Sequence, residues 1–101
     1  MLTLEQKKEL LSLARNAISA RFKHQSVSLP EDPAFSPKRG VFVSLHIGDN
    51  LRGCIGYIKG YKSIAESVKE MAEAAAFQDP RFPPLTEKEL EKVTIEISIL
   101  S

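Results

Sequence analysis

Two segments in which apolar and more polar residues alternate constrain this chain more than any other feature. In the first, Val41–Ile47, every second residue is a large aliphatic one, which is the period of a half-buried strand. Gly48-Asp49-Asn50 is typical of a turn, and Leu51–Ile58 is predicted to be the returning strand. The second alternating segment is Val93–Ile99. The sequence therefore predicts an antiparallel hairpin and one further strand.

Three helices are predicted from capping boxes, in which Ser or Thr is followed three residues later by Glu or Gln. Thr3 with Gln6 opens a helix over about 3–21, a second begins at Ser63 and stops at Asp79-Pro80, and a third covers about 86–91. The order helix, hairpin, helix, short helix, strand predicts an α+β fold, with a mainly antiparallel sheet and flanking helices. The apolar stripe of the first helix is expected to hold Leu10, Leu11, Ala14, Ala17, Ile18 and Phe22.

Two proline-containing segments join these elements. Lys23–Arg39 contains three prolines and is expected to hold no helix or central strand. It is either a functional or mobile loop, or a segment that wraps across the sheet with Leu29 and Phe35 as anchors. Arg81-Phe82-Pro83-Pro84 is predicted to be extended and stiff.

Composition limits the classes of function. The chain has 101 residues, which suits one small domain, and its formal net charge of +1 predicts no chain-wide attraction to nucleic acid or an anionic membrane. The single cysteine, Cys54, excludes an internal disulfide and favours a reducing, cytoplasmic setting. We expect no metal or other cofactor, because no Cys/His cluster is present. No signal peptide and no membrane-spanning run is expected either.

The returning strand holds the residues that are best suited to binding or catalysis. Gly53 and Gly56 weaken a strand interior, so they suggest a bulge or the close approach of a backbone or a ligand. In one interpretation they open a small cleft in which Arg52 binds an anion and Cys54 is a nucleophile or redox thiol. In the other they allow tight packing, with Cys54 a buried small hydrophobe and Arg52 a surface or paired side chain.

The register of the hairpin decides where the thiol points. We favour a three-residue loop that pairs Ile47 with Leu51, since it places Ser44 opposite Cys54 and His46 opposite Arg52. A two-residue Asp49-Asn50 turn would instead pair Leu45 with Cys54 and bury the thiol. In the favoured register His46 and Cys54 are diagonal neighbours, too far apart for a Cys/His dyad. His24, near a helix end, is expected to be solvated.

The end of the second helix carries a further charged pair. Asp79 and Arg81 flank Pro80 and either form a local ion pair that fixes the helix exit or place Arg81 in a binding patch. That patch would combine Arg81 with Arg52 and Arg39 to hold an anion. Phe77 and Phe82 are expected to be core anchors.

Leu51-Arg52-Gly53-Cys54-Ile55-Gly56 resembles the signature of the AMMECR-type domain family, whose prokaryotic members are also called AmmeMemoRadiSam system protein A. Gly40–Leu45, Ala75–Thr86 and Ile95–Ser101 resemble further blocks of that family in the same order. The resemblance implies an α+β fold, and it implies that residues 1–101 are the N-terminal part of a single AMMECR-type domain. The last strand of such an incomplete domain would lack a neighbour and could self-associate.

The resemblance also bears on function without deciding it. Its implied partners are Memo-like and radical SAM proteins, which suggests an accessory or binding module. The binding residues would be Arg52, Gly53, Cys54, Gly56 and Arg81. One alternative is an enzyme that uses Cys54 as the catalytic residue, with Arg52 binding an anionic substrate. Another is a protein linked to RNA modification, which the near-neutral charge does not favour.

Overall fold

The computed structural model describes residues 1–101 and confirms the predicted fold class and element order. Three antiparallel strands form one sheet in the order β2-β1-β3, so the hairpin pairs as expected and β3 joins on the far side of β1. The elements, in chain order, are α1 (Leu4–Phe22), the short 3-10 turn η1 (Pro33–Phe35), β1 (Val41–Ile47), β2 (Asn50–Tyr57), α2 (Ile64–Phe77), α3 (Glu87–Leu90) and β3 (Val93–Ile99).

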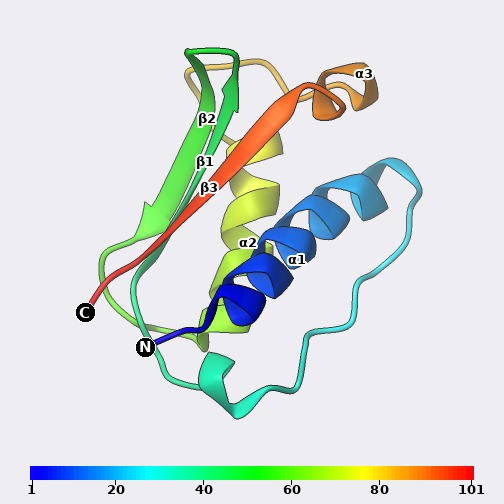
Figure 1. Cartoon of the computed structure of the whole chain (residues 1–101). Coiled ribbons are helices and arrows are strands. Elements are labelled where there is room, and N and C mark those ends of the chain that lie inside the picture. The colour runs from blue at the N-terminus through cyan, green and yellow to red at the C-terminus, as the bar shows by residue number, and fades with distance from the viewer.

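The molecule has two layers, with α1 and α2 on one face of the sheet and no helix on the other (Figure 1). Along β1 the alternation is complete on the helix side, where Val41, Val43 and Leu45 are fully buried. Their neighbours Phe42, Ser44 and His46 point to the other face and are only half-buried. We call this uncovered side the outer face of the sheet.

All three capping boxes are present, with Thr3, Ser63 and Thr86 as the N-cap residues. Helix α2 ends at Phe77, before the Asp79-Pro80 stop that the sequence predicts. One predicted core residue of α1 is wrong: Leu11 is 38% exposed. Leu13 is buried in its stead, because the helical period places residues three and four apart on the buried side and puts Leu11 at its margin.

The segment between α1 and β1 wraps the body of the protein, but it lies against α2 and not across the sheet. Phe35 anchors it at 1% exposure, whereas Leu29, the other predicted anchor, is 38% exposed. Val27 packs against the core in its place, and Lys38 forms an isolated bridge with Ser63. Figure 1 shows this segment running outside the helices before it reaches β1.

At Gly53, the backbone of α2 lies in close contact with the sheet. A Cβ atom on this residue would overlap the carbonyl oxygen of Ala75, so only glycine allows the observed spacing between β2 and α2. Gly48, in the hairpin turn, has a φ of 60° and no atom near the position of a Cβ. The two glycines are thus needed for different reasons, one for space and one for conformation.

This difference predicts unequal effects of two matched substitutions. Gly53→Ala should lower the free energy of unfolding by about 3 kcal/mol, because α2 must move or the strand must distort. Gly48→Ala should cost about 1 kcal/mol, since it only places a Cβ in a left-handed conformation. Urea unfolding followed by circular dichroism measures both. Equal losses would contradict the close approach at Gly53.

Candidate functional site

Strand β2 contains a bulge at Arg52, and this changes the predicted register. Two residues form the loop, since Ile47 pairs with Asn50, and the register then shifts so that Leu45 pairs with Gly53. Arg52 is the extra residue, so the predicted pairing of His46 with Arg52 is wrong, and His46 lies opposite Leu51. The three-residue loop is also wrong, because Gly48 at positive φ allows a tighter turn.

The bulge restores the offset that a three-residue loop would give, so Ser44 lies opposite Cys54 as predicted. The Ser44 hydroxyl donates a hydrogen bond to the Cys54 sulfur at 3.2 Å. On the other side of Ser44, β3 places Glu96 directly opposite. Cys54, Ser44 and Glu96 therefore form a row across the outer face, and Cys54 is half-buried.

His46 lies one row further along the same face, between Leu51 and Thr94. It is a diagonal neighbour of Cys54, and no hydrogen bond joins the two side chains. The Nδ1 atom of His46 is buried and has no hydrogen-bonding partner. An unpaired buried nitrogen is uncommon in folded proteins, and neighbouring protein atoms shield this one from solvent.

The backbone of Cys54 is held from outside the sheet by a charged pair. Asp79, only 4% exposed, accepts a hydrogen bond from the Cys54 N–H at 3.0 Å. Arg81 donates to the Cys54 carbonyl at 3.3 Å and to both Asp79 oxygens, at 3.0 and 2.8 Å. The hydrogen bonds from Arg81 hold the pKa of Asp79 far below its usual range. We call this arrangement the Asp79–Arg81 clamp.

The clamp confirms the local ion pair among the two interpretations of Asp79 and Arg81. It also corrects the first half of the predicted extended segment, Arg81-Phe82, because the Phe82 N–H donates to the Asp79 carbonyl and closes a turn over residues 79–82. An aspartate whose side chain accepts from the backbone two residues on favours such a turn over an extended chain.

Arg52 also forms an ion pair, and its partner, Glu89, was not predicted from the sequence. Its guanidinium donates to both oxygens of Glu89, at 2.9 and 3.1 Å, and to the Pro83 carbonyl at 2.9 Å. The pKa of Glu89 falls to about 2, chiefly because of these bonds from Arg52 and then because of the bond from the Thr86 backbone. One terminal nitrogen of Arg52, Nη1, is buried without a partner.

Phe82 lies beside both of these arginines, with its ring centre 5.8 Å from the Arg52 guanidinium carbon and 5.4 Å from that of Arg81. The two candidate anion-binding residues are thus close together, but each already holds a carboxylate of this chain. Arg39 is exposed and forms no ion pair. Phe77 packs edge-on against Phe22 and is half-buried, as is Phe82.

Protein atoms fill the space at the two signature glycines. Gly53 faces the backbone of α2, and a Cβ on Gly56 would overlap the Phe42 ring and the Val41 carbonyl. Phe42 and Gly56 pair across the hairpin, so the ring covers the glycine on the outer face. The geometry at both positions is one of close packing.

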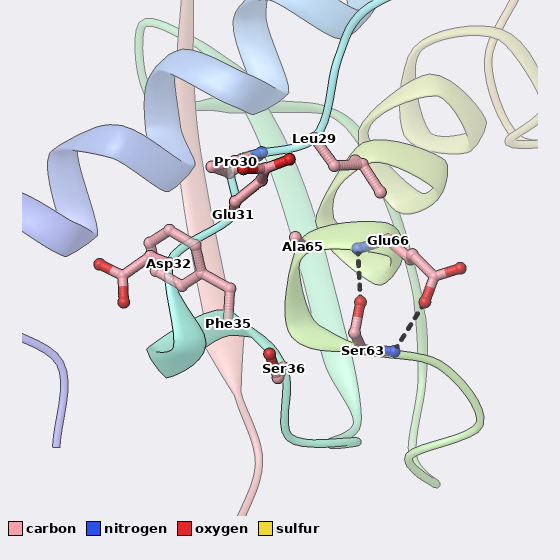
Figure 2. A pocket seen from close by; sticks show the side chains of 9 residues that line it. All are labelled: Leu29, Pro30, Glu31, Asp32, Phe35, Ser36, Ser63, Ala65 and Glu66. Carbon is pink, nitrogen blue, oxygen red and sulfur yellow. Dashed lines mark hydrogen bonds between the residues drawn. The ribbon is translucent and has the colours of Figure 1, made fainter.

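A cavity of about 210 Å³ lies elsewhere, between the segment that precedes β1 and the first turn of α2 (Figure 2). Figure 2 shows the Ser63 and Glu66 capping box at its rim, with the ring of Phe35 at its base. None of the signature residues lines this cavity. No group of three or more His, Cys, Asp or Glu side chains is placed to hold a metal ion, and none of the helices combines the length and apolarity that crossing a bilayer requires.

Comparison with known proteins identifies the family. A family model described as AMMECR1 matches residues 11–101. The chain belongs to the AMMECR1 family. Among curated relatives, a protein of Methanothermobacter thermautotrophicus is 39% identical over 99% of this chain and 54% of its own length. A Methanopyrus kandleri protein is 42% identical over 99% of this chain and 51% of its own length. The chain spans about half the length of these relatives.

A solved structure shares this AMMECR1-type fold. The crystal structure of an uncharacterised protein from Pyrococcus horikoshii superposes with a TM-score of 0.91 at 32% sequence identity. The match covers 99% of this chain and 53% of that chain. The resemblance noted from the LRGCIG signature is confirmed, and the names of these relatives state no activity.

The Arg52–Glu89 pair makes stability depend on pH. Because the pKa of Glu89 is about 2 in the folded state and about 4.3 in an unfolded chain, its contribution is complete above pH 4.5 and is lost as the pH falls towards 2. Glu89→Gln keeps a residue able to complete the capping box and removes only the charge. We expect this variant to be about 1 kcal/mol less stable than wild type at pH 7 and the difference to vanish by about pH 2.

The matched control for this measurement is Glu87→Gln, which removes an exposed carboxylate from the same helix. Its stability curve, obtained from urea unfolding at each pH, should run parallel to that of the wild type. A Glu89→Gln curve that also runs parallel would mean that the pair with Arg52 contributes nothing in solution.

Proposed function

We propose that this AMMECR1-type domain is a non-catalytic binding module that uses the outer face of the sheet to contact partner proteins. The observation that carries the proposal is that Arg52 and Arg81, the two candidate anion-binding residues, are already paired with carboxylates of this chain. Arg52 and Arg81 hold Glu89 and Asp79, so a substrate anion would have to compete with a carboxylate already bound at each guanidinium. Because both arginines bond to groups of this chain, we assign them a structural role. The outer face of the sheet, which they help to hold in place, is the candidate recognition surface.

The outer face has the properties that recognition requires. It presents the Cys54–Ser44–Glu96 row, the half-buried ring of His46 and the Phe42 ring, and no helix covers it. Polar groups that can pair, placed beside an aromatic ring, are typical of interfaces between folded proteins. The rigid sheet beneath them means that a partner would order few side chains on binding.

The partners in this proposal are Memo-like and radical SAM proteins, as the family resemblance implies. The outer face supplies the surface, and the resemblance supplies the identity of the partners. A cytoplasmic setting belongs to the same proposal, since a chain with one unpaired cysteine suits a reducing compartment.

A matched pair of substitutions tests this surface. Thr94→Arg places a long cation on the outer face next to His46, and Ser12→Arg places the same side chain on an exposed position of α1. We expect Thr94→Arg to weaken binding to purified Memo-like and radical SAM proteins by about tenfold or more, as truncation of an interface centre does. Biolayer interferometry measures both affinities. Equal binding by the two variants would place the interface elsewhere, and no binding by the wild type would remove these partners.

A second candidate function is an enzyme that uses Cys54 as a nucleophile or redox thiol. The hydrogen bond from the Ser44 hydroxyl to the Cys54 sulfur favours it, because such a donor stabilises negative charge on sulfur. The bond from Arg52 to Glu89 counts against it, since an anionic substrate would have to displace a carboxylate already bound.

The rate of alkylation at Cys54 separates the two functions. For a binding module we expect a small probe such as iodoacetamide to label the folded chain about tenfold more slowly than the denatured chain at neutral pH, because the thiol is half-buried. Faster labelling of the folded chain, abolished by Ser44→Ala, would favour the enzyme. Denatured wild-type and Ser44→Ala chains provide the control for intrinsic thiol chemistry.

A further inference from the structure

The connection between β2 and α2 exposes two large apolar side chains. Ile58 is 77% exposed and Tyr61 is 62% exposed, and the Tyr61 ring packs edge-on against Tyr57 with the ring centres 5.6 Å apart. The connection follows β2, which β1 separates from β3, and Figure 1 shows it at the end of the sheet where β1 begins. An aliphatic and an aromatic side chain exposed in one short connection form a candidate contact surface.

Positive charge gathers in this connection and in the segment that lies against it. Residues 37–40 and 57–62 hold four basic residues and no Asp or Glu, whereas the whole chain has 14 basic and 13 acidic residues. Lys62 pairs with Glu70 of α2, and the other three cations form no ion pair. We call the exposed cations and apolar residues of these two segments the basic patch, namely Lys38, Arg39, Ile58, Lys59, Tyr61 and Lys62.

Close backbone contacts hold the two segments of the basic patch together. A Cβ atom on Gly60 would overlap the backbone of Lys38, and a Cβ atom on Gly40 would overlap the Ile58 carbonyl. Lys38 also forms an isolated bridge with Ser63, the residue that caps α2. The two segments are therefore fixed side by side, and a ligand would order little of their backbone on binding.

The combination of positive charge and apolar surface selects the occupant. We propose that the basic patch binds an acidic segment of a partner protein, in which Asp or Glu side chains flank an apolar residue. The carboxylates would pair with Arg39 and Lys59, and the apolar side chain would pack on Ile58 beside the Tyr61 ring. Complementary charge speeds association and orients the segment, while the apolar centre contributes affinity. The patch lies at the end of the sheet, so it can be tested independently of the outer face.

Two other anionic ligands fit the basic patch less well. Nucleic acid would satisfy the cations, but interfaces with nucleic acid are strongly polar, so the exposed side chain of Ile58 would gain little from them. A membrane surface that attracts cations is broad and negative, and it would repel Glu66 and Glu70, which lie beside Lys38 and Lys62. A short protein segment can reach the cations without meeting these carboxylates.

The test uses two fluorescein-labelled peptides rich in Asp and Glu, one with a central leucine and the other with serine at that position. We expect the leucine peptide to bind about tenfold more tightly, and both peptides to bind more weakly as salt is added. Fluorescence polarisation measures the affinities. Absence of binding, or equal affinity for the two peptides, would overturn the proposal. Tighter binding of oligothymidylate or of phosphatidylserine-rich vesicles would assign the patch to nucleic acid or to membrane, and would overturn it too.

Matched substitutions locate the binding site on the chain. Ile58→Ser should weaken binding of the leucine peptide by about tenfold and leave the serine peptide unchanged, because only the leucine peptide buries an apolar side chain there. Arg39→Gln with Lys59→Gln should weaken both peptides by about tenfold. Lys7→Gln with Lys8→Gln removes the same charge from exposed positions of α1 and should change neither affinity. Circular dichroism checks folding. Equal losses from the two double variants would mean that net charge alone attracts the peptides, and would refute the proposal.

Discussion

The hydrogen bonds that Asp79 makes with the backbone of Cys54 and with Arg81 are the constraint on which the rest of the site depends. Asp79 is almost fully buried, and a buried carboxylate is stable only when it is well paired. Here one oxygen takes the Cys54 N–H while Arg81 bonds both oxygens and returns to the Cys54 carbonyl. The clamp thus fixes the exit of α2 against the middle of β2.

Because the clamp fixes where α2 ends, it limits the path of the residues that follow. This path leads to the second ion pair, between Arg52 and Glu89. The turn over residues 79–82 brings Phe82 between the two arginines and carries the chain past Arg52, whose guanidinium binds the Pro83 carbonyl. Helix α3 follows directly and supplies Glu89. Residues 79–89 therefore bind β2 along the edge that faces away from β1. The charged residues of this segment support the sheet and leave the outer face to make contacts.

Local patterns predicted the elements well because each depends on residues close together in sequence. The three capping boxes predicted the helix starts, and the alternation of apolar residues predicted β3. The pairing of Ser44 with Cys54 was predicted correctly but for a wrong reason. The loop is shorter than expected, and the bulge at Arg52 compensates for it. A two-residue loop followed by a bulge gives the same strand register beyond the bulge as a three-residue loop without a bulge. The alternation of apolar residues therefore cannot distinguish the two arrangements.

With one exception, the partners of the charged residues could not be predicted from the sequence. Asp79 and Arg81 are two residues apart, so a local pair could be foreseen. Arg52 and Glu89 are 37 residues apart, and nothing in either segment signals the other. The same holds for Glu96, which joins the Cys54–Ser44 row only because β3 pairs with β1 and not with β2. Contacts of this kind depend on strand order, which no local pattern encodes.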